Sequence, residues 1–228
     1  MTTDEVLQRL ESLGSKKNIE GMKRFNIPST KAFGVRAPNI RMLAKEIKKD
    51  HHLAIELWNT GYHESRVLAA MVADAGSANL KLMDTWVNEI ENWAQCDNCC
   101  AEFFEKTKYA ESLPFRWAKS KKEYVRRAGI VMIAEMAVHC KEAEDEFFMQ
   151  YFHLFKQYSI DNRNFVKKAV NWALRQVGKR NIPLQKKVLT LSEEILKIPS
   201  ASARWIAKDA IRELTSQKTI ALINRRKG

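Results

Sequence analysis

The hydrophobic positions of this chain recur at helical spacing almost throughout. Ala, Leu, Ile and Met follow one another at intervals of three and four residues, and the alternation of period two that is typical of strands does not occur. Turn-forming residues are few, with 8 Gly and 5 Pro in 228 residues. The pattern therefore predicts an all-α fold. We expect helices at roughly 4–13, 16–25, 38–49, 52–59, 63–75, 79–91, 93–107, 110–118, 121–138, 143–158, 162–178, 183–197, 201–214 and 217–225.

A short motif repeats in the second half of the chain. Residues 127–130 (RAGI), 168–171 (KAVN) and 209–212 (DAIR) recur at 41-residue steps, and each places a small residue behind a polar one. A repeat of about 40 residues is the unit length of HEAT-type helix pairs. We therefore predict a single domain, residues 1–228, that forms a right-handed solenoid of about six or seven HEAT-like pairs with a concave basic face. The alternative is a generic helical bundle, and residues 221–228 are expected to form a frayed basic tail.

The net positive charge comes entirely from the second half of the chain. Residues 1–110 hold 15 Lys+Arg and 15 Asp+Glu, whereas residues 111–228 hold 24 and 12, a difference that equals the whole net charge of +12. A polyanionic partner is indicated, with nucleic acid ahead of an anionic membrane surface, and simple solubility is the alternative. No run reaches the ~18 apolar residues of a membrane span and no signal segment opens the chain, so we expect a cytoplasmic protein.

One carboxylate stands out beside this basic half. Asp97 follows Trp93 by one helical turn, so the two side chains share a helix face. Carboxylates repel phosphates, so an acid near a polyanion should have a task other than affinity. Further along, Lys168, Trp172 and Arg175 form a stripe of cations and an aromatic ring that suits binding to a DNA backbone. The alternative is a solvated face with core tryptophans, a role that we assign to Trp58, Trp86 and Trp117.

The cysteines do not predict a metal site. Cys96, Cys99 and Cys100 have the i, i+3, i+4 spacing of an apolar helix seam. His139 and Cys140 could add ligands, but the segment lacks the turns that structural zinc sites use. In a reducing compartment all four cysteines should be thiols. Since no glycine loop that could cradle phosphates is present, no nucleotide cofactor is expected either.

Three motifs in order resemble the AlkD-like family of DNA alkylation repair glycosylases, which are built from HEAT-like repeats. They are Trp93 with Asp97, Arg127 before a small-residue pair, and Trp172 followed by Ala-Leu-Arg, and the stretch FGVRAPNIR at 33–41 lies near the start of the resemblance. The resemblance runs from Met-Lys at 22–23 to the helix that ends at residue 214, which is most of the chain.

The resemblance implies excision of positively charged N3- or N7-alkylated purines from duplex DNA, by a monomer and without a cofactor. A cationic base leaves without a general acid, so one carboxylate suffices to stabilise the developing oxocarbenium ion and to position water. The family pattern gives this task to Asp97. Trp93 and Trp172 would frame the lesion and Arg127 would hold a phosphate. Arg41, Lys168 and Arg175 are further candidate phosphate contacts, from helix position and partial motif match.

The sequence leaves alternatives open. Ala94 stands where relatives often carry a second acid, and Gly21 stands where well-known members carry a tyrosine just before Met-Lys. Related HEAT-like branches without detectable glycosylase activity bind unusual DNA structures, so a non-catalytic protein for branched or distorted DNA is the second hypothesis. A protein–protein scaffold is the third. Asp97 could also be an ordinary helix-face aspartate that pairs with Arg127.

Overall fold

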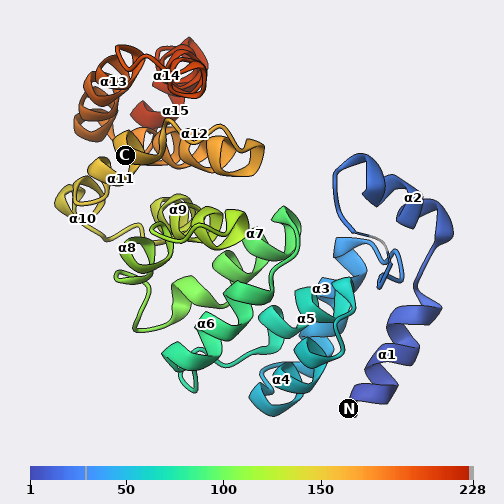
Figure 1. Ribbon diagram of the computed structural model, residues 1–228. Coiled ribbons are helices and arrows are strands. Elements are labelled where there is room, and N and C mark those ends of the chain that lie inside the picture. Colours follow the sequence, from blue (N-terminus) through green and yellow to red (C-terminus); the bar gives the residue numbers. More distant parts are fainter. Residues whose placement is uncertain (29, 226–228) are drawn as a thin grey trace. The chain divides into compact units, whose positions relative to one another are not determined.

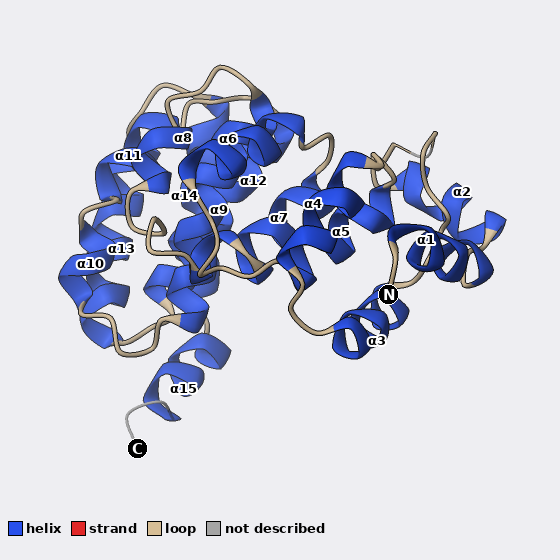
Figure 2. Ribbon diagram, turned by 90° about the horizontal axis from the view of Figure 1, so that it is seen from below, coloured by secondary structure: helices blue, strands red, loops and turns tan. Residues whose placement is uncertain are grey.

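Every regular element in the described part of the chain is a helix. The computed structural model describes residues 1–28 and 30–225 (Figures 1 and 2), and within them the all-α prediction is confirmed. None of these helices is both long and apolar enough to cross a membrane. The elements are α1 (Thr3–Ser12), α2 (Lys16–Arg24), α3 (Ala37–Ile47), α4 (His51–Asn59), α5 (His63–Val72), α6 (Leu80–Glu89), α7 (Trp93–Glu102), the 3-10 turn η1 (Phe104–Lys106), α8 (Leu113–Trp117), α9 (Glu123–His139), α10 (Asp145–Met149), α11 (Phe152–Tyr158), α12 (Asn164–Gly178), α13 (Ile182–Leu196), α14 (Ala201–Leu214) and α15 (Gln217–Arg225).

The chain divides into two compact units. Unit 1 is Met1–Ala110 and unit 2 is Glu111–Gly228. The boundary falls where the charge changes, so unit 1 has no net charge and unit 2 carries all of the +12. The expectation of one continuous domain stays a prediction. Within unit 2, helix α15 includes residues 221–225 of the predicted frayed tail, and 226–228 lie outside the described residues.

The core of unit 1 is aromatic and centres on α4 to α7. Helix α5 packs against α3, α4 and α7. Trp58 and Trp86 are fully buried and stack with ring centroids 4.3 Å apart, and Phe103 packs against Trp86 at 5.2 Å. The predicted core role of these tryptophans is confirmed, as it is for Trp117 in unit 2.

Small residues explain the 41-residue repeat in unit 2. Helix α12 packs against α9 on one side and α14 on the other. Ala128, Ala169 and Ala210 take equivalent places on these three helices and are completely buried, so the backbones can approach closely. At Gly129 a Cβ atom would lie 2.6 Å from the backbone nitrogen of Ala118, which only glycine avoids.

Two predicted helices are interrupted at buried aromatic residues. The helix expected at 93–107 ends at Glu102, because Phe103 leaves helical backbone angles (φ −132°, ψ −60°) and leads into η1, and Phe103 and Phe104 are both fully buried. The helix expected at 143–158 is broken into α10 and α11. At the break, Tyr151 is fully buried and its hydroxyl donates a 2.9 Å hydrogen bond to the carbonyl of Glu111.

Candidate functional site

Helix α7 carries Trp93 and Asp97, and its first residue is fixed by a cap. Asn92 is buried, and its side-chain oxygen accepts a 3.0 Å hydrogen bond from the amide of Gln95. The Asn92 Nδ2 atom also lies 3.4 Å from Nδ1 of His63 on α5. Burial lowers the pKa of His63, so the ring is neutral at pH 7 and can accept this contact. The cap therefore fixes both the start of α7 and its attachment to α5.

The inner face of α7 binds it to the rest of unit 1. Asn98 donates a 2.9 Å hydrogen bond to the carbonyl of Val67 on α5. Cys96, Cys99 and Cys100 are completely buried, as expected for an apolar seam. Burial raises the pKa of the Cys99 and Cys100 thiols well above their ordinary value, so both stay protonated and are poor nucleophiles.

Trp93 and Asp97 lie on the half-buried part of α7, one turn apart. The indole Nε1–H of Trp93 donates a 2.8 Å hydrogen bond to the carbonyl of Phe25, the residue that follows α2. This bond joins positions 68 residues apart and fixes the indole at its edge. Trp93 and Asp97 thus lie one turn apart on a single helix, and the indole of Trp93 is held in place.

A buried carboxylate that the sequence did not reveal organises the FGVRAPNIR motif. Glu64 on α5 is 1% exposed, and its oxygens accept backbone hydrogen bonds from Phe33, Gly34 and Val35 at 2.9, 2.7 and 3.1 Å. Gly34 has φ +77°, a left-handed conformation that favours glycine. The loop enters α3, on which the predicted phosphate contact Arg41 is exposed.

In unit 2, Arg127 lies on α9 and is largely buried. The residue is only 6% exposed, and its guanidinium donates a 2.6 Å hydrogen bond to the carbonyl of Phe165. This contact joins α9 to α12. The sequence predicted a phosphate contact here, and that role stays a prediction beside the structural one.

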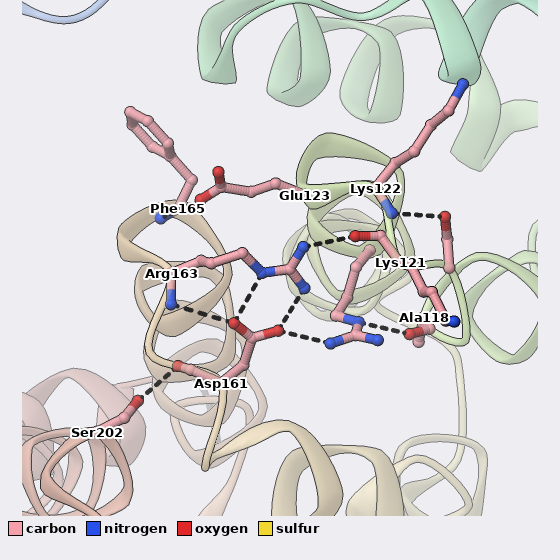
Figure 3. Close-up of polar contacts among 10 residues, drawn as sticks. Ala118, Lys121, Lys122, Glu123, Asp161, Arg163, Phe165 and Ser202 are labelled. Carbon is pink, nitrogen blue, oxygen red and sulfur yellow. Dashed lines mark hydrogen bonds and ion pairs between the residues drawn. The ribbon is translucent and has the colours of Figure 1, made fainter.

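A second organising carboxylate, also missed by the sequence, holds the starts of α9 and α12 together (Figure 3). Asp161 accepts hydrogen bonds from Arg163 at 2.5 and 2.9 Å and from Arg126 at 2.6 Å. Its own carbonyl accepts a 2.8 Å bond from Ser202 on α14. Burial alone would raise the pKa of Asp161, but the hydrogen bonds from Arg163 and Arg126 lower it to about 2. Arg163 also donates a hydrogen bond to the carbonyl of Lys121, just before α9. The cluster therefore joins α9, α12 and α14.

Helix α12 brings together the predicted stripe of Lys168, Trp172 and Arg175. Lys168 is exposed and Trp172 is half-buried. The guanidinium of Arg175 forms an ion pair with Glu213 on α14, and its phosphate contact stays a prediction. Burial alone would raise the pKa of Glu213, but Lys179 and Arg175 hold it below its ordinary value, so the carboxylate stays charged.

The seven predicted site residues are divided between the units. Arg41, Trp93 and Asp97 belong to unit 1, whereas Arg127, Lys168, Trp172 and Arg175 belong to unit 2. Helix α7 carries both Trp93 and Asp97, and helix α12 carries the whole stripe of Lys168, Trp172 and Arg175.

One solved structure superposes on almost the whole of this chain. A structure described as "a new family of proteins related to the HEAT-like repeat DNA glycosylases with affinity for branched DNA structures" superposes with a TM-score of 0.77 and 20% identity, over 93% of this chain and 95% of that one. A designed armadillo repeat protein in complex with the peptide (KR)4 gives a TM-score of 0.41 and 15% identity over 93% and 88%. No match was found among curated proteins.

The first of these likenesses identifies the fold of this chain as HEAT-like. The sequence pattern of the family described as "DNA alkylation repair enzyme" matches residues 6–214. Because that range covers most of the chain, this protein belongs to the DNA alkylation repair enzyme family.

Proposed function

We propose that this protein is a DNA glycosylase that hydrolyses the N-glycosidic bond of positively charged N3- or N7-alkylated purines in duplex DNA. The observation that carries the proposal is the fixed Trp93–Asp97 pair. Helix α7 is attached to α5 through Asn92 and Asn98, and the Trp93 indole is bonded to the carbonyl of Phe25. Membership of the DNA alkylation repair enzyme family supports the same reading.

The chemistry needs one carboxylate. When the bond between C1′ and the alkylated base breaks, its electron pair neutralises the cationic base, so no acid has to protonate the leaving group. Positive charge then develops on the deoxyribose, and the carboxylate of Asp97 stabilises it. Water adds to C1′ from the open side, and Asp97 orients this water and takes its proton. The step consumes only water and needs no cofactor.

The other site residues have framing tasks in this proposal. Trp93 would present its ring face to the charged nucleotide, to which cation–π attraction draws it, and the framing role of Trp172 is the one that the family resemblance implies. The phosphate contact of Arg127 is the role that the family resemblance implies, beside its bond to the carbonyl of Phe165. Lys168 and Arg41 are exposed and can reach a phosphate directly, whereas Arg175 would have to exchange Glu213 for one.

Binding of branched DNA is a second candidate function, and the surface at Gly21 favours it. A Cβ atom at Gly21 would meet no atom within 4 Å, so α2 leaves an open surface at this position. The solved structure with the 0.77 TM-score belongs to proteins with affinity for branched DNA. This chain could accordingly bind branched or distorted DNA without releasing a base.

Base release and binding, measured together, separate these functions. Wild type, Asp97→Asn and Glu102→Gln are compared on duplexes with one N7- or N3-alkylpurine, on plain duplex and on a four-way junction. Glu102→Gln is the matched control, since it removes a half-buried carboxylate from the same helix. The glycosylase proposal expects Asp97→Asn to lower base release about 100- to 1,000-fold while DNA binding persists.

Two other results of this comparison favour the alternative functions. Tight binding of the junction by all three proteins, without base release by wild type, supports the non-catalytic function. Failure of wild type to bind any of these DNAs at moderate salt supports a protein scaffold.

A further inference from the structure

Phe25 is an aromatic side chain left in solvent. It is 64% exposed, the largest value among the large hydrophobic side chains that the structure describes. Covering a phenylalanine typically stabilises by about 1.5–3 kcal/mol, so an exposed ring is a surface that a partner can use. Single exposed hydrophobic residues are common, however, so the position of Phe25 has to decide whether it matters.

Phe25 contacts Trp93 through its backbone. Its carbonyl accepts the 2.8 Å hydrogen bond from the indole of Trp93. The residue that exposes its ring is therefore the one that holds Trp93 in place. Asp97 follows Trp93 by one turn of α7, so all three residues belong to one region of unit 1.

The surface next to Phe25 is open. Gly21 lies on α2 four residues before Phe25, the residue that ends the helix. A Cβ atom at Gly21 would touch nothing within 4 Å. The surface of α2 therefore leaves space close to the exposed ring of Phe25.

The charge around this face suits DNA. Lys23 and Arg24, between Gly21 and Phe25, are both exposed. Although unit 1 has no net charge, this end of α2 carries two adjacent cations beside an aromatic ring. Cations for phosphates together with a ring for bases are the combination by which proteins hold nucleic-acid strands whose bases are accessible.

We propose that Phe25 forms a nucleobase subsite, in which its ring stacks on the face of an unstacked base in the DNA strand that enters the Trp93–Asp97 site. The face of α2 at Gly21 provides the room for that base, and Lys23 and Arg24 contact the adjoining phosphates. This inference rests on the proposed function for the identity of the strand. It adds a base contact to a site that otherwise binds sugar and backbone.

The test compares Phe25→Ala, Phe25→Tyr and Met42→Ala. Met42→Ala is the matched control, because Met42 is another exposed apolar side chain of unit 1, at 51%. All three variants keep the backbone carbonyl that holds Trp93. The probe is an alkylated duplex with 2-aminopurine at successive positions around the lesion, whose fluorescence reports both affinity and stacking. Urea unfolding confirms that each variant is folded.

We expect Phe25→Ala to weaken binding about 5- to 100-fold and to change the 2-aminopurine fluorescence at one position near the lesion. Phe25→Tyr should retain both properties, and Met42→Ala should behave as wild type. Unchanged affinity and fluorescence in Phe25→Ala would overturn the inference, as would an equal loss in Met42→Ala. The readouts of this test are affinity and fluorescence, and base release is measured separately. A wild type that binds but does not release bases therefore counts against the proposed function and leaves this test intact.

Discussion

Asp161 gives the most quantitative prediction about stability. Its side chain is 7% exposed, and it accepts charge-assisted hydrogen bonds from Arg126 and Arg163 at the point where α9 and α12 begin. Replacement by Asn keeps the shape but removes the negative charge that both guanidinium groups face. The starts of the two helices should then be held less firmly.

The pKa sets the size of the effect. The pKa of Asp161 falls from 3.8 to about 2 in the folded protein, and a shift of that size corresponds to about 2 kcal/mol at neutral pH. The cluster borders a recess of about 580 Å³ that admits water, so we expect Asp161→Asn to lower the free energy of unfolding by about 1–2 kcal/mol.

The pH dependence follows from the direction of the shift. Because the folded pKa is the lower one, the carboxylate stabilises fully above the unfolded value of 3.8, and this stabilisation is lost as pH falls toward 2. Urea unfolding followed by circular dichroism at pH 7, 5, 4 and 3 measures it. The difference between wild type and Asp161→Asn should be constant at pH 7 and 5 and should shrink between pH 4 and 3.

Glu142 provides the control for the Asp161→Asn measurement. Glu142→Gln removes an exposed acid from the same unit and should change stability little at any of these pH values. If Asp161→Asn is as stable as wild type at pH 7, or if the difference stays the same down to pH 3, the Asp161 cluster does not stabilise unit 2 as we argue.

Three further predictions concern packing, backbone capping and DNA binding. Glu64→Gln should lower the free energy of unfolding by about 2–3 kcal/mol in urea, because a buried amide cannot satisfy the three backbone N–H groups of 33–35; a smaller loss than in a surface acid variant would contradict this. Gly129→Ala should cost about 1–3 kcal/mol, because its Cβ would clash with α8. Gly21→Ala, which meets open space, should be neutral or stabilising by up to about 1 kcal/mol, and equal effects of the two substitutions would refute the packing argument. Lys168→Ala should reduce the slope of log K against log salt for duplex DNA by about 0.9, and an unchanged slope would exclude a phosphate contact there.

Periodic features of the chain were predictable from sequence. Helical spacing gave the all-α fold, and the small residues at 41-residue steps identified the closely packed helices α9, α12 and α14. The breaks were not predictable, because no glycine or proline marks the chain near Phe103 or Tyr151. Buried aromatic side chains lie at both breaks and make contacts that appear only in the folded structure.

The site shows the same limit. Trp93 and Asp97 are a local pair, so their spacing alone placed them on one helix face. Glu64 acts on a loop 29 to 31 residues away and Asp161 acts on an arginine 35 residues away, so neither leaves a local signal. For Arg175, the ion pair with Glu213 on α14 could not be inferred from the spacing of the α12 stripe.

The most direct test of the central claim is single-turnover base release from a duplex with one N7- or N3-alkylpurine. Wild type, Asp97→Asn and Glu102→Gln are used at saturating protein concentration, so that differences in affinity do not contribute. We expect release by wild type and Glu102→Gln, with a rate about 100- to 1,000-fold lower for Asp97→Asn. Equal rates for wild type and Asp97→Asn, or no release by wild type while it binds the duplex, would contradict the assignment of Asp97 as the catalytic carboxylate.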